Sequence, residues 1–378
     1  MLEKLKQTHL LVCVGSRSDQ VCSIGAFARA EANAFREIFG SVNLIEPSAA
    51  EKFPDFKTVT SNPDFILLHS PSLHDRKKPW NALTAFAKIR FRFPKAIILP
   101  VVHEYSEAPW HWRARQRTIN ALSSGVIVNS SADEAFVKSQ AMQLLRVPLG
   151  PTLFEAELTS NPDEQKLKEK MAHYRLEISK KFKLNPELKW ILHPGLVTPG
   201  KGVNFLSKLR PILNAGEQLI VMGGLGPKEK DRAFAAQVIQ GLKRDLGERF
   251  VFIEAPSDEW FGKMLTASDL VLLPYDVGVS ERRSSFLSAM SCGANVWSTS
   301  GMYSGPLNLD KTAVHLVSAS IWMESSAEVG NSIKKALLED ENKKIARRIS
   351  NLKWAKTRSW ALRTAKMGEF FLGLSKRS

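Results

Sequence analysis

Two loops in the second half of the sequence carry the residue types that bind phosphate. Residues 194–202 (PGLVTPGKG) set Lys201 among glycines, and residues 276–285 hold Arg282 and Arg283 among serines. A guanidinium matches phosphate oxygens with a planar set of donors, and free N–H groups at the start of a helix add more. The loops therefore predict an anion site, although an ordinary solvated loop between a strand and a helix has the same spacing.

Each loop follows an apolar run that is typical of a buried strand. Residues 190–193 precede the first loop, and residues 270–274 precede the second and end in proline. Residues 286–292 have helical character, and Gly293 suits the end of that helix. Similar apolar runs at 219–222, 250–253, 294–299 and 314–317 alternate with helical segments. This half therefore predicts a parallel α/β sheet.

The first half repeats the alternation, with apolar runs at 10–14, 42–45, 65–69, 96–103, 125–129 and 144–149. The run at 96–103 delivers His103 and Glu104 at its carboxyl end, where ligands bind in open α/β sheets. A histidine there can serve chemistry or fill a structural hydrogen-bonding role. Gly25 begins the helix after the first strand, where a missing side chain allows either a ligand or a neighbouring strand to approach.

The length of 378 residues suits two domains. We expect an α/β protein with two Rossmann-like domains facing across a cleft. The predicted first domain spans residues 1–152, the second spans 153–350, and 351–378 form a final helix. The charged segment 151–189, which begins at the boundary between the two domains, is interpreted as a hinge with an inserted helix.

Composition excludes several classes of protein. The three cysteines form no CxxC pair, which indicates a reducing cytosol without structural disulfides or zinc. No apolar run approaches the ~20 residues of a membrane-spanning helix. The run at 10–14 is too short for the core of a signal peptide.

The net charge of +15 is concentrated in two segments. Residues 341–378 contain eleven Lys and Arg against two Glu, and residues 76–95 interleave seven basic residues with four aromatic ones. Such a pattern favours a surface for anionic lipid headgroups. Nucleic acid and a solvated helix that buries its own aromatic rings are the alternatives. No nucleic-acid-binding motif accompanies the charge, so nucleic acid is not an expected partner.

Several short motifs, in this order, resemble those of the retaining family 4 glycosyltransferases, which have the GT-B fold. Residues 190–205 (WILHPGLVTPGKGVNF) resemble the family's GR-L-x-P-x-KG loop. Residues 252–274 and 289–296 (AMSCGANV) resemble its E-L…AD-V-x-L-x-P and A-M-A-C-G-x-P-V stretches. In the first half, 23–31 (SIGAFARAE) resemble GIGRY-x-R-E-L, and 101–104 (VVHE) resemble the H-D/E strand end.

The resemblance implies a metal-independent hexosyltransferase without a bound cofactor. Its donor would be a nucleoside diphosphate sugar, and its acceptor a glycan or lipid-linked molecule of cell-surface polysaccharide or glycolipid synthesis. Catalytic roles would fall to Lys201 and Arg282 at the diphosphate and to His103 at the transferred sugar. The last helix would cross back to the first domain. The residues implied for donor binding are Gly25, Glu104, Gly195, Gly202, Gly224, Ser280, Arg283, Ser284 and Ser285.

Two departures from the family pattern affect this interpretation. The family's arginine after the loop glycine is Leu196 here, and its E-x7-E glutamates fall on Ser280 and Ser288. Arg282 and Arg283 supply the cations that Leu196 does not, and some members carry an S-x-R-R-S-x-L loop of this kind. The absence of both carboxylates keeps an alternative open, a catalytically inactive scaffold subunit that binds nucleotide.

Overall fold

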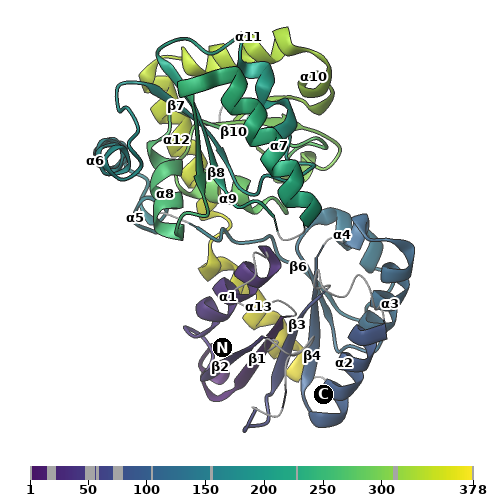
Figure 1. The fold of residues 1–378 in the computed structure, drawn as a ribbon. Helices are drawn as coiled ribbons and strands as arrows, with labels where there is room; N and C mark the ends of the chain where they lie inside the picture. Colours follow the sequence, from purple (N-terminus) through teal and green to yellow (C-terminus); the bar gives the residue numbers. More distant parts are fainter. Residues whose placement is uncertain are drawn as a thin grey trace. The chain divides into compact units, whose positions relative to one another are not determined.

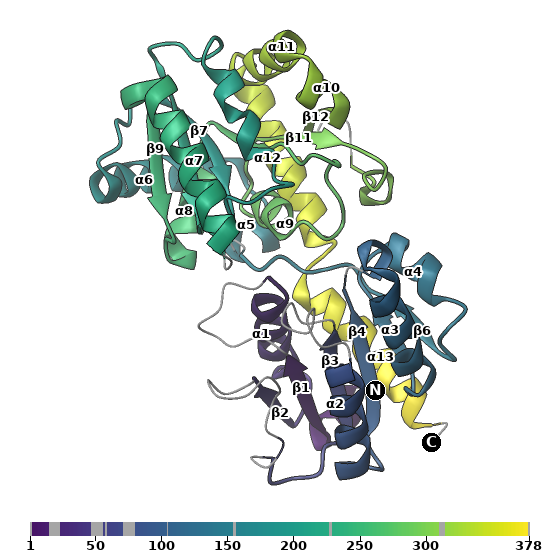
Figure 2. The same ribbon diagram turned by 45° about the vertical axis from the view of Figure 1, so that its right-hand side comes forward.

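The structure is a computed structural model that describes residues 2–14, 23–46, 56, 59–70, 80–103, 105–153, 156–226, 229–309 and 314–376. The chain divides into two compact units, Met1–Thr152 with Arg358–Ser378 and Leu153–Thr357. Each unit is built around one parallel sheet of six strands (Figures 1 and 2). The expected α/β class with two Rossmann-like sheets is therefore confirmed.

The sheet of the first unit has the strand order β2-β1-β3-β4-β5-β6. Each of the six apolar runs predicted as strands in this half forms one of them. In chain order they are β1 (His9–Val14), β2 (Ser41–Ile45), β3 (Phe65–Ser70), β4 (Ile97–Val102), β5 (Val126–Val128) and β6 (Leu144–Arg146).

Alternate residues of β1 face two different helical layers, because side chains alternate across a strand. Leu10 and Val12 belong to one core with α1 (Ser23–Phe35) and α13 (Trp360–Ser375). Leu11 and Cys13 belong to another, with α2 (Trp80–Arg92) and α3 (Trp110–Ala121). Shorter elements of this unit are η1 (Leu2–Gln7), η4 (Tyr105–Glu107) and α4 (Ser131–Val137).

Helix α13 completes the core of the first unit although it is the last element of the chain. Phe371 of this helix is fully buried, and its ring stacks on Phe65 with the ring centres 5.1 Å apart. The ring of Phe39 lies 5.7 Å away. The expected return of the C-terminal helix to the first domain is thus confirmed.

The sheet of the second unit has the order β12-β11-β10-β7-β8-β9, so the direction of strand addition reverses between β7 and β10. Ligands of open α/β sheets bind beyond the carboxyl ends of the strands at such a reversal. All six predicted strands are present. They are β7 (Lys189–Pro194), β8 (Glu217–Gly223), β9 (Phe250–Glu254), β10 (Leu270–Leu273), β11 (Val296–Ser300) and β12 (Val314–Ser318).

Helices cover this second sheet in two groups. One core contains apolar residues of η5 (Val203–Leu209), α7 (Glu229–Leu246), α10 (Ala319–Glu324) and α11 (Ser326–Leu337). The other helices are α5 (Ala156–Ser160), α6 (Glu164–Phe182), α8 (Asp258–Ala267), α9 (Ser284–Ser291) and α12 (Glu341–Lys356). The element that follows the loop after β7 is a 3₁₀ helix, η5, because Gly202 and Pro211 leave room for only a short element.

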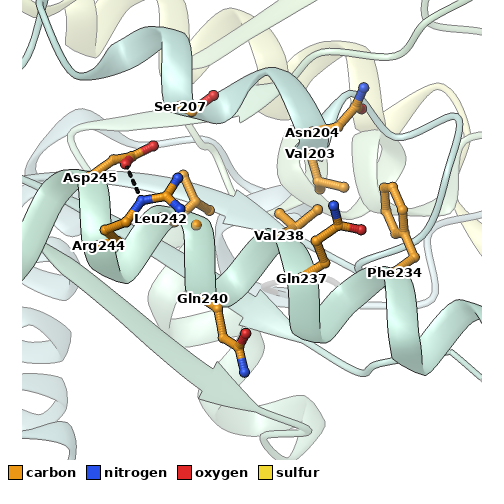
Figure 3. A pocket seen from close by; sticks show the side chains of 11 residues that line it. Val203, Asn204, Ser207, Phe234, Gln237, Val238, Gln240, Leu242, Arg244 and Asp245 are labelled. Atoms are coloured by element: carbon orange, nitrogen blue, oxygen red, sulfur yellow. Dashed lines mark hydrogen bonds and ion pairs between the residues drawn. The ribbon is translucent and has the colours of Figure 1, made fainter.

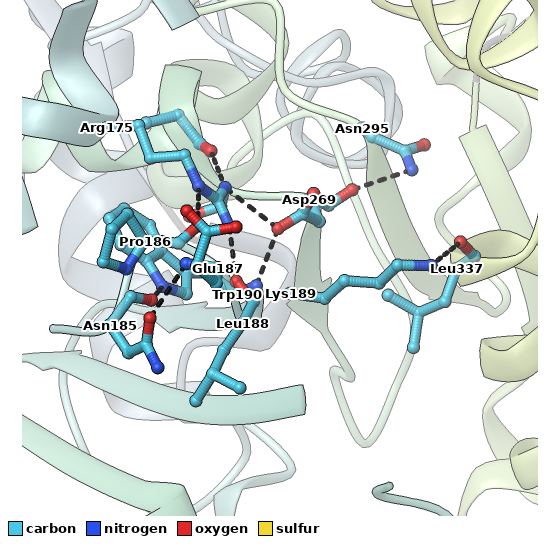
Figure 4. A network of polar contacts seen from close by, with 12 residues as sticks. Arg175, Asn185, Pro186, Glu187, Leu188, Lys189, Trp190, Asp269, Asn295 and Leu337 are labelled. Atoms are coloured by element: carbon cyan, nitrogen blue, oxygen red, sulfur yellow. Dashed lines mark hydrogen bonds and ion pairs between the residues drawn. The ribbon is translucent and has the colours of Figure 1, made fainter. Parts of the chain in front are cut away.

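Arg175 of α6 ties the charged segment to the second sheet (Figure 4). Its guanidinium donates to the carbonyl oxygen of Pro186 at 2.8 Å and to that of Leu188. It also pairs with Asp269 at 3.1 Å and lies 4.3 Å from the ring centre of Trp190. The inserted helix is thus an integral part of this unit.

Arg348 of α12 is buried, and its guanidinium forms hydrogen bonds with backbone carbonyl groups. Its guanidinium donates to the carbonyl oxygens of Thr266 and Gly293, both at 3.0 Å, and to that of Ser268. These carbonyls lie at the ends of α8 and α9, where helix dipoles favour a cation. Burial lowers the pKa of Arg348 to about 10, so it remains charged at neutral pH.

Candidate functional site

The loops after β7 and β10 meet where strand order reverses, because these two strands pair directly. Two cations from the loops lie against one aromatic ring. The Nζ atom of Lys201 is 5.4 Å from the ring centre of Tyr275, and the guanidinium carbon of Arg283 is 4.8 Å from it. The Nε atom of Arg283 is buried and has no hydrogen-bond partner among the described residues, so it is available to an acceptor such as a phosphate oxygen.

Tyr275 connects these cations to the start of α9. Its side chain is buried, and its hydroxyl is 2.7 Å from the Oγ atom of Ser285. Burial raises the pKa of Tyr275 to about 12, so the hydroxyl stays neutral and adds no negative charge. The ring therefore fixes the spacing of the cations without neutralising them.

Asp276 holds the lysine loop in place. Its carboxylate lies near the backbone N–H groups of Gly200 and Gly202, on either side of Lys201, and interacts with Arg283. Burial raises the pKa of Asp276. The two loops carry three cations, Lys201, Arg282 and Arg283, against the carboxylates of Asp276 and the buried Glu281, so their formal charge is positive, as an anion site requires.

Gly202 permits the close packing of the two loops. It has φ +68°, and a Cβ atom there would lie 1.8 Å from the carbonyl oxygen of Pro274. Gly200 also has a positive φ, +84°, but nothing lies within 4 Å of its would-be Cβ atom. A side chain at either glycine would therefore be strained by the left-handed backbone, but only a side chain at Gly202 would also clash with a neighbouring loop.

These glycines give a matched pair of variants. We expect Gly202→Ala to lower nucleotide affinity roughly tenfold or more, because the clash must displace the lysine loop. Gly200→Ala carries only the left-handed backbone cost, about 1–2 kcal/mol of stability. Isothermal titration with a nucleoside diphosphate compares the two, and equal losses of affinity would contradict the role of this contact.

The other glycines predicted for the donor lie at the same edge of the sheet. A Cβ atom on Gly195 would be 3.8 Å from that of Ser285. Gly223 approaches Gly195 so closely that its Cβ atom would be 1.9 Å from the Gly195 carbonyl oxygen. The carbonyl of Gly224 accepts from the N–H group of Val197 at 2.9 Å. The loops after β7 and β8 are therefore held together by a backbone hydrogen bond and by close backbone packing.

The predicted serines and arginines separate into two groups. Ser284 and Ser285 form the first turn of α9, and Arg283 directly precedes it. Arg282 instead lies over the ring of Tyr303, 5.9 Å from its centre. Ser280 and Ser288, at the positions of the family glutamates, are both buried. Ser288 accepts from the N–H group of Leu153 at 3.3 Å, a structural use of its hydroxyl.

In the first unit, His103 directly follows β4 and is buried. Its Nε2 atom is 3.1 Å from Nδ1 of His69, and its Nδ1 atom is 3.1 Å from Nδ2 of Asn129. Gly25 is buried in the first turn of α1. Glu104 lies outside the described residues. The structure thus places His103 in a hydrogen-bonded cluster of its own unit.

Several site residues escaped the sequence interpretation. Tyr275 and Asp276 directly follow the predicted strand at 270–274. Their position at the carboxyl end of a strand could have indicated that they belong to the site. His69 ends the predicted strand at 65–69 and Asn129 ends that at 125–129, both at the carboxyl edge of the first sheet. Their partners lie on other elements, which no local pattern reveals.

His193 contributes a pH-sensitive position next to the lysine loop. Its Nδ1 atom is 3.0 Å from the carbonyl oxygen of Leu272, while its buried Nε2 atom has no hydrogen-bond partner among the described residues. Burial, aided by the charge of Lys201, lowers the pKa of His193 from 6.5 to about 4.

Acid should therefore destabilise this unit through His193. Between pH 4 and 6.5 the unfolded chain binds more protons than the folded one, so the free energy of unfolding falls as the pH falls through this window, by about 3 kcal/mol. His193→Asn keeps a donor for Leu272 and should flatten the profile. Urea unfolding of the wild type and of His193→Asn at several pH values gives the two stability profiles. Burial also lowers the pKa of His315 to about 4. Because His315 is present in the wild type and in His193→Asn, it does not contribute to the difference between their profiles. Parallel profiles would contradict the assignment.

A separate groove of about 600 Å³ lies on the helical layer of the second unit (Figure 3). All its lining residues belong to η5 and α7, and none of the predicted donor residues is among them.

Among the described residues, no group of three or more His, Cys, Asp and Glu side chains is arranged to hold a metal ion. None of the described helices has the length and apolarity needed to cross a membrane.

No protein-family model matches the sequence, and no curated protein matches it either. Solved structures match over almost the whole chain. Sucrose-phosphate synthase from Thermosynechococcus elongatus has a TM-score of 0.68 at 17% identity, covering 98% of this chain and 100% of its own. A glycosyltransferase from Rickettsia africae ESF-5 has a TM-score of 0.69 at 12% identity, with coverage of 98% and 100%.

A third similar structure is HepE from Anabaena in complex with UDP and glucose. Its TM-score is 0.65 at 16% identity, covering 97% of this chain and 99% of its own. At such identities the likeness establishes the fold. The chain therefore has the GT-B fold that its motifs predicted.

Proposed function

We propose that this protein is a retaining glycosyltransferase that transfers a sugar from a nucleoside diphosphate sugar to a glycan or lipid-linked acceptor. The observation that carries the proposal is the pair of cations, Lys201 and Arg283, on the ring of Tyr275 where strand order reverses in the second sheet. We assign the donor to the second domain and the acceptor to the first.

The chemistry follows from charge. When the bond between sugar and diphosphate breaks, negative charge grows on the leaving group, and fixed cations stabilise it without reorganisation. Lys201 and Arg283 supply those cations, and Arg282 supplies another from the same loop. Backbone N–H groups at Ser284 and Ser285 add donors from the first turn of α9. These groups do not require a metal or a further cofactor.

The remaining predicted residues complete the proposed donor site. Gly195, Gly202, Gly224 and Ser280 lie on loops of the second unit, while Gly25, His103 and Glu104 would act from the first. The Anabaena structure with UDP and glucose supports uridine diphosphate and a hexose as the first donor to test.

Thermal unfolding with a series of nucleoside diphosphates and sugar nucleotides tests the proposal. A true donor raises the melting temperature, and release of its diphosphate with added acceptor measures transfer. Stabilisation without turnover on any glycan or lipid-linked acceptor would favour the inactive scaffold, for which Ser280 and Ser288 are the motivation. No stabilisation by any nucleotide would refute both.

We also propose that the outer face of α2 contacts anionic lipid. Phe91 is 90% exposed, and the exposed cations Lys88, Arg92 and Lys95 surround it in sequence. Two other aromatic residues of this segment, Phe86 and Phe93, are structural, because they are buried in the core. The C-terminal segment likewise uses cations internally, since Lys344, Arg348 and Arg363 are buried.

We expect the triple substitution Lys88→Ala, Arg92→Ala and Lys95→Ala to weaken sedimentation with phosphatidylglycerol vesicles roughly 100-fold, at about 1 kcal/mol per charge. Wild-type binding should also disappear at about 1 M salt. The α7 variant Lys243→Ala with Arg244→Ala is the control. Wild-type protein that fails to bind vesicles at low salt would assign these charges to solvent alone.

A further inference from the structure

Five buried polar side chains form a continuous chain inside the first unit. Arg363 of α13 donates from Nε to Oε1 of Glu31 at 2.6 Å, and Oε2 of Glu31 lies 3.0 Å from Nε2 of His69. The next steps are His69 Nδ1 to His103 Nε2 and His103 Nδ1 to Asn129 Nδ2, both 3.1 Å. All five side chains are at most 5% exposed. The fourth member of this chain, His103, is the residue predicted to contact the sugar.

The first two members fix the direction of every proton in this chain. Arg363 can only donate. Burial alone would raise the pKa of Glu31, but Arg363 and His69 lower it to about 2, so this carboxylate is ionised and can only accept. Nε2 of His69 lies 3.0 Å from this carboxylate, and although the pair does not have the geometry of a hydrogen bond, the negative charge favours the hydrogen of His69 on Nε2. A neutral imidazole has one donor and one acceptor nitrogen, so Nδ1 of His69 accepts.

The tautomer of His69 also determines the tautomer of His103. Because Nδ1 of His69 accepts, Nε2 of His103 must carry the hydrogen, and Nδ1 of His103 keeps its lone pair. The amide nitrogen of Asn129, which only donates, fits that lone pair. Each link is thus consistent with a single arrangement of hydrogens.

We propose that Glu31 and His69 are positioning residues that fix His103 as its Nε2–H tautomer, so that Nδ1 is a hydrogen-bond acceptor at the carboxyl edge of the first sheet. The inference rests on the proposed function for its consequence, because a sugar hydroxyl is the donor that such an acceptor would bind. Asn129 occupies the acceptor in this structure. Its own Oδ1 atom is buried without a hydrogen-bond partner among the described residues, so the amide can turn when a hydroxyl replaces it.

Packing by Phe27 excludes water from the five linked polar side chains. The ring of Phe27 meets both histidine rings edge-on, with centres 6.0 Å from His69 and 5.7 Å from His103. Arg363 lies 4.8 Å from the centre of the same ring, and Trp360 of α13 packs against it at 5.1 Å. Exclusion of water strengthens the hydrogen bonds and prevents solvent from setting the tautomers.

A single near-isosteric substitution should reverse the chain. In Glu31→Gln the amide oxygen must face Arg363, which can only donate, so the amide N–H group faces Nε2 of His69. His69 then carries its hydrogen on Nδ1 and donates to Nε2 of His103. His103 becomes the Nδ1–H tautomer, and Asn129 turns its carbonyl oxygen toward it.

Nuclear magnetic resonance of protein labelled with ¹⁵N in its histidine rings reads these tautomers directly. We expect an Nε2–H tautomer at His103 in the wild type and Nδ1–H in Glu31→Gln. His9 is an internal control, since its nitrogens lie 3.1 Å from Asn43 Nδ2 and 3.0 Å from Ser61 Oγ at the other end of β1. Its spectrum should not change. A wild-type His103 that is charged or carries its hydrogen on Nδ1 would overturn the proposal.

His69→Gln is the second variant. Glutamine can donate to Glu31 and accept from His103, so it should keep the wild-type tautomer, whereas general damage to the cluster would affect both variants alike. Where transfer is measurable, we expect kcat to fall at least tenfold in Glu31→Gln, with donor KM within twofold. Inverted tautomers with an unchanged kcat would remove the functional consequence. Absence of all transfer in the wild type would refute the glycosyltransferase alone, because the spectra do not depend on turnover.

Discussion

Replacing Lys201 with alanine is expected to weaken binding of a nucleoside diphosphate by roughly 10- to 150-fold, and Arg283→Ala should have an effect of the same size. This range corresponds to about 1.5–3 kcal/mol for a hydrogen bond to a charged group. Both cations lie on the ring of Tyr275, and Asp276 fixes the loop that carries the lysine. Isothermal titration with uridine diphosphate provides the measurement.

Exposed cations on α7 provide matched controls, because the C-terminal end of this helix is remote from the strand ends. Lys243→Ala and Arg244→Ala should change affinity less than twofold. Arg282→Ala separates the neighbouring arginines: its guanidinium lies over Tyr303, so we expect a smaller loss of diphosphate affinity and a greater effect on transfer. Unchanged affinity in both Lys201→Ala and Arg283→Ala would refute the proposed donor site.

Replacing Arg348 with leucine should lower the free energy of unfolding of the second unit by about 3–5 kcal/mol. The guanidinium satisfies three buried carbonyl oxygens at the ends of α8 and α9, and each unsatisfied buried acceptor costs about 1–3 kcal/mol. The added apolar surface of leucine offsets part of that loss. Urea unfolding followed by tryptophan fluorescence measures the change.

The exposed Arg244 is the control for this substitution. Arg244→Leu should remain within about 0.5 kcal/mol of the wild type, as surface changes usually do. A stability loss in Arg348→Leu no larger than that of Arg244→Leu would mean that water or neighbouring donors replace the guanidinium.

The strands were predictable because they are short apolar runs, distinct from the helices between them, and β1, β4, β8 and β10 are buried along their whole length. The 3₁₀ form of η5 was not, since hydrophobic periodicity alone does not distinguish such a short helix. Phe86 and Phe93 have the same local pattern as Phe91, and only packing against the sheet separates the buried rings from the exposed one.

The candidate site was predictable in part for a related reason. Lys201, Arg282 and Arg283 stand in loops at strand ends, a position that can be inferred from sequence. The cluster around His103 was not predictable, because Glu31 and Arg363 are 332 positions apart. Their pairing depends on where α13 packs, which composition and periodicity do not encode.

The position of α13 also has a consequence for the order of folding during synthesis. The first 152 residues leave the ribosome early, yet the core of their unit lacks Phe371 and their Glu31 lacks Arg363 until the last helix has been made. The second unit, by contrast, is contiguous in the chain and has all its core residues before that point. The first unit should therefore reach its native state after the second, because Glu31 and the apolar surface around it remain uncovered until α13 has been synthesised.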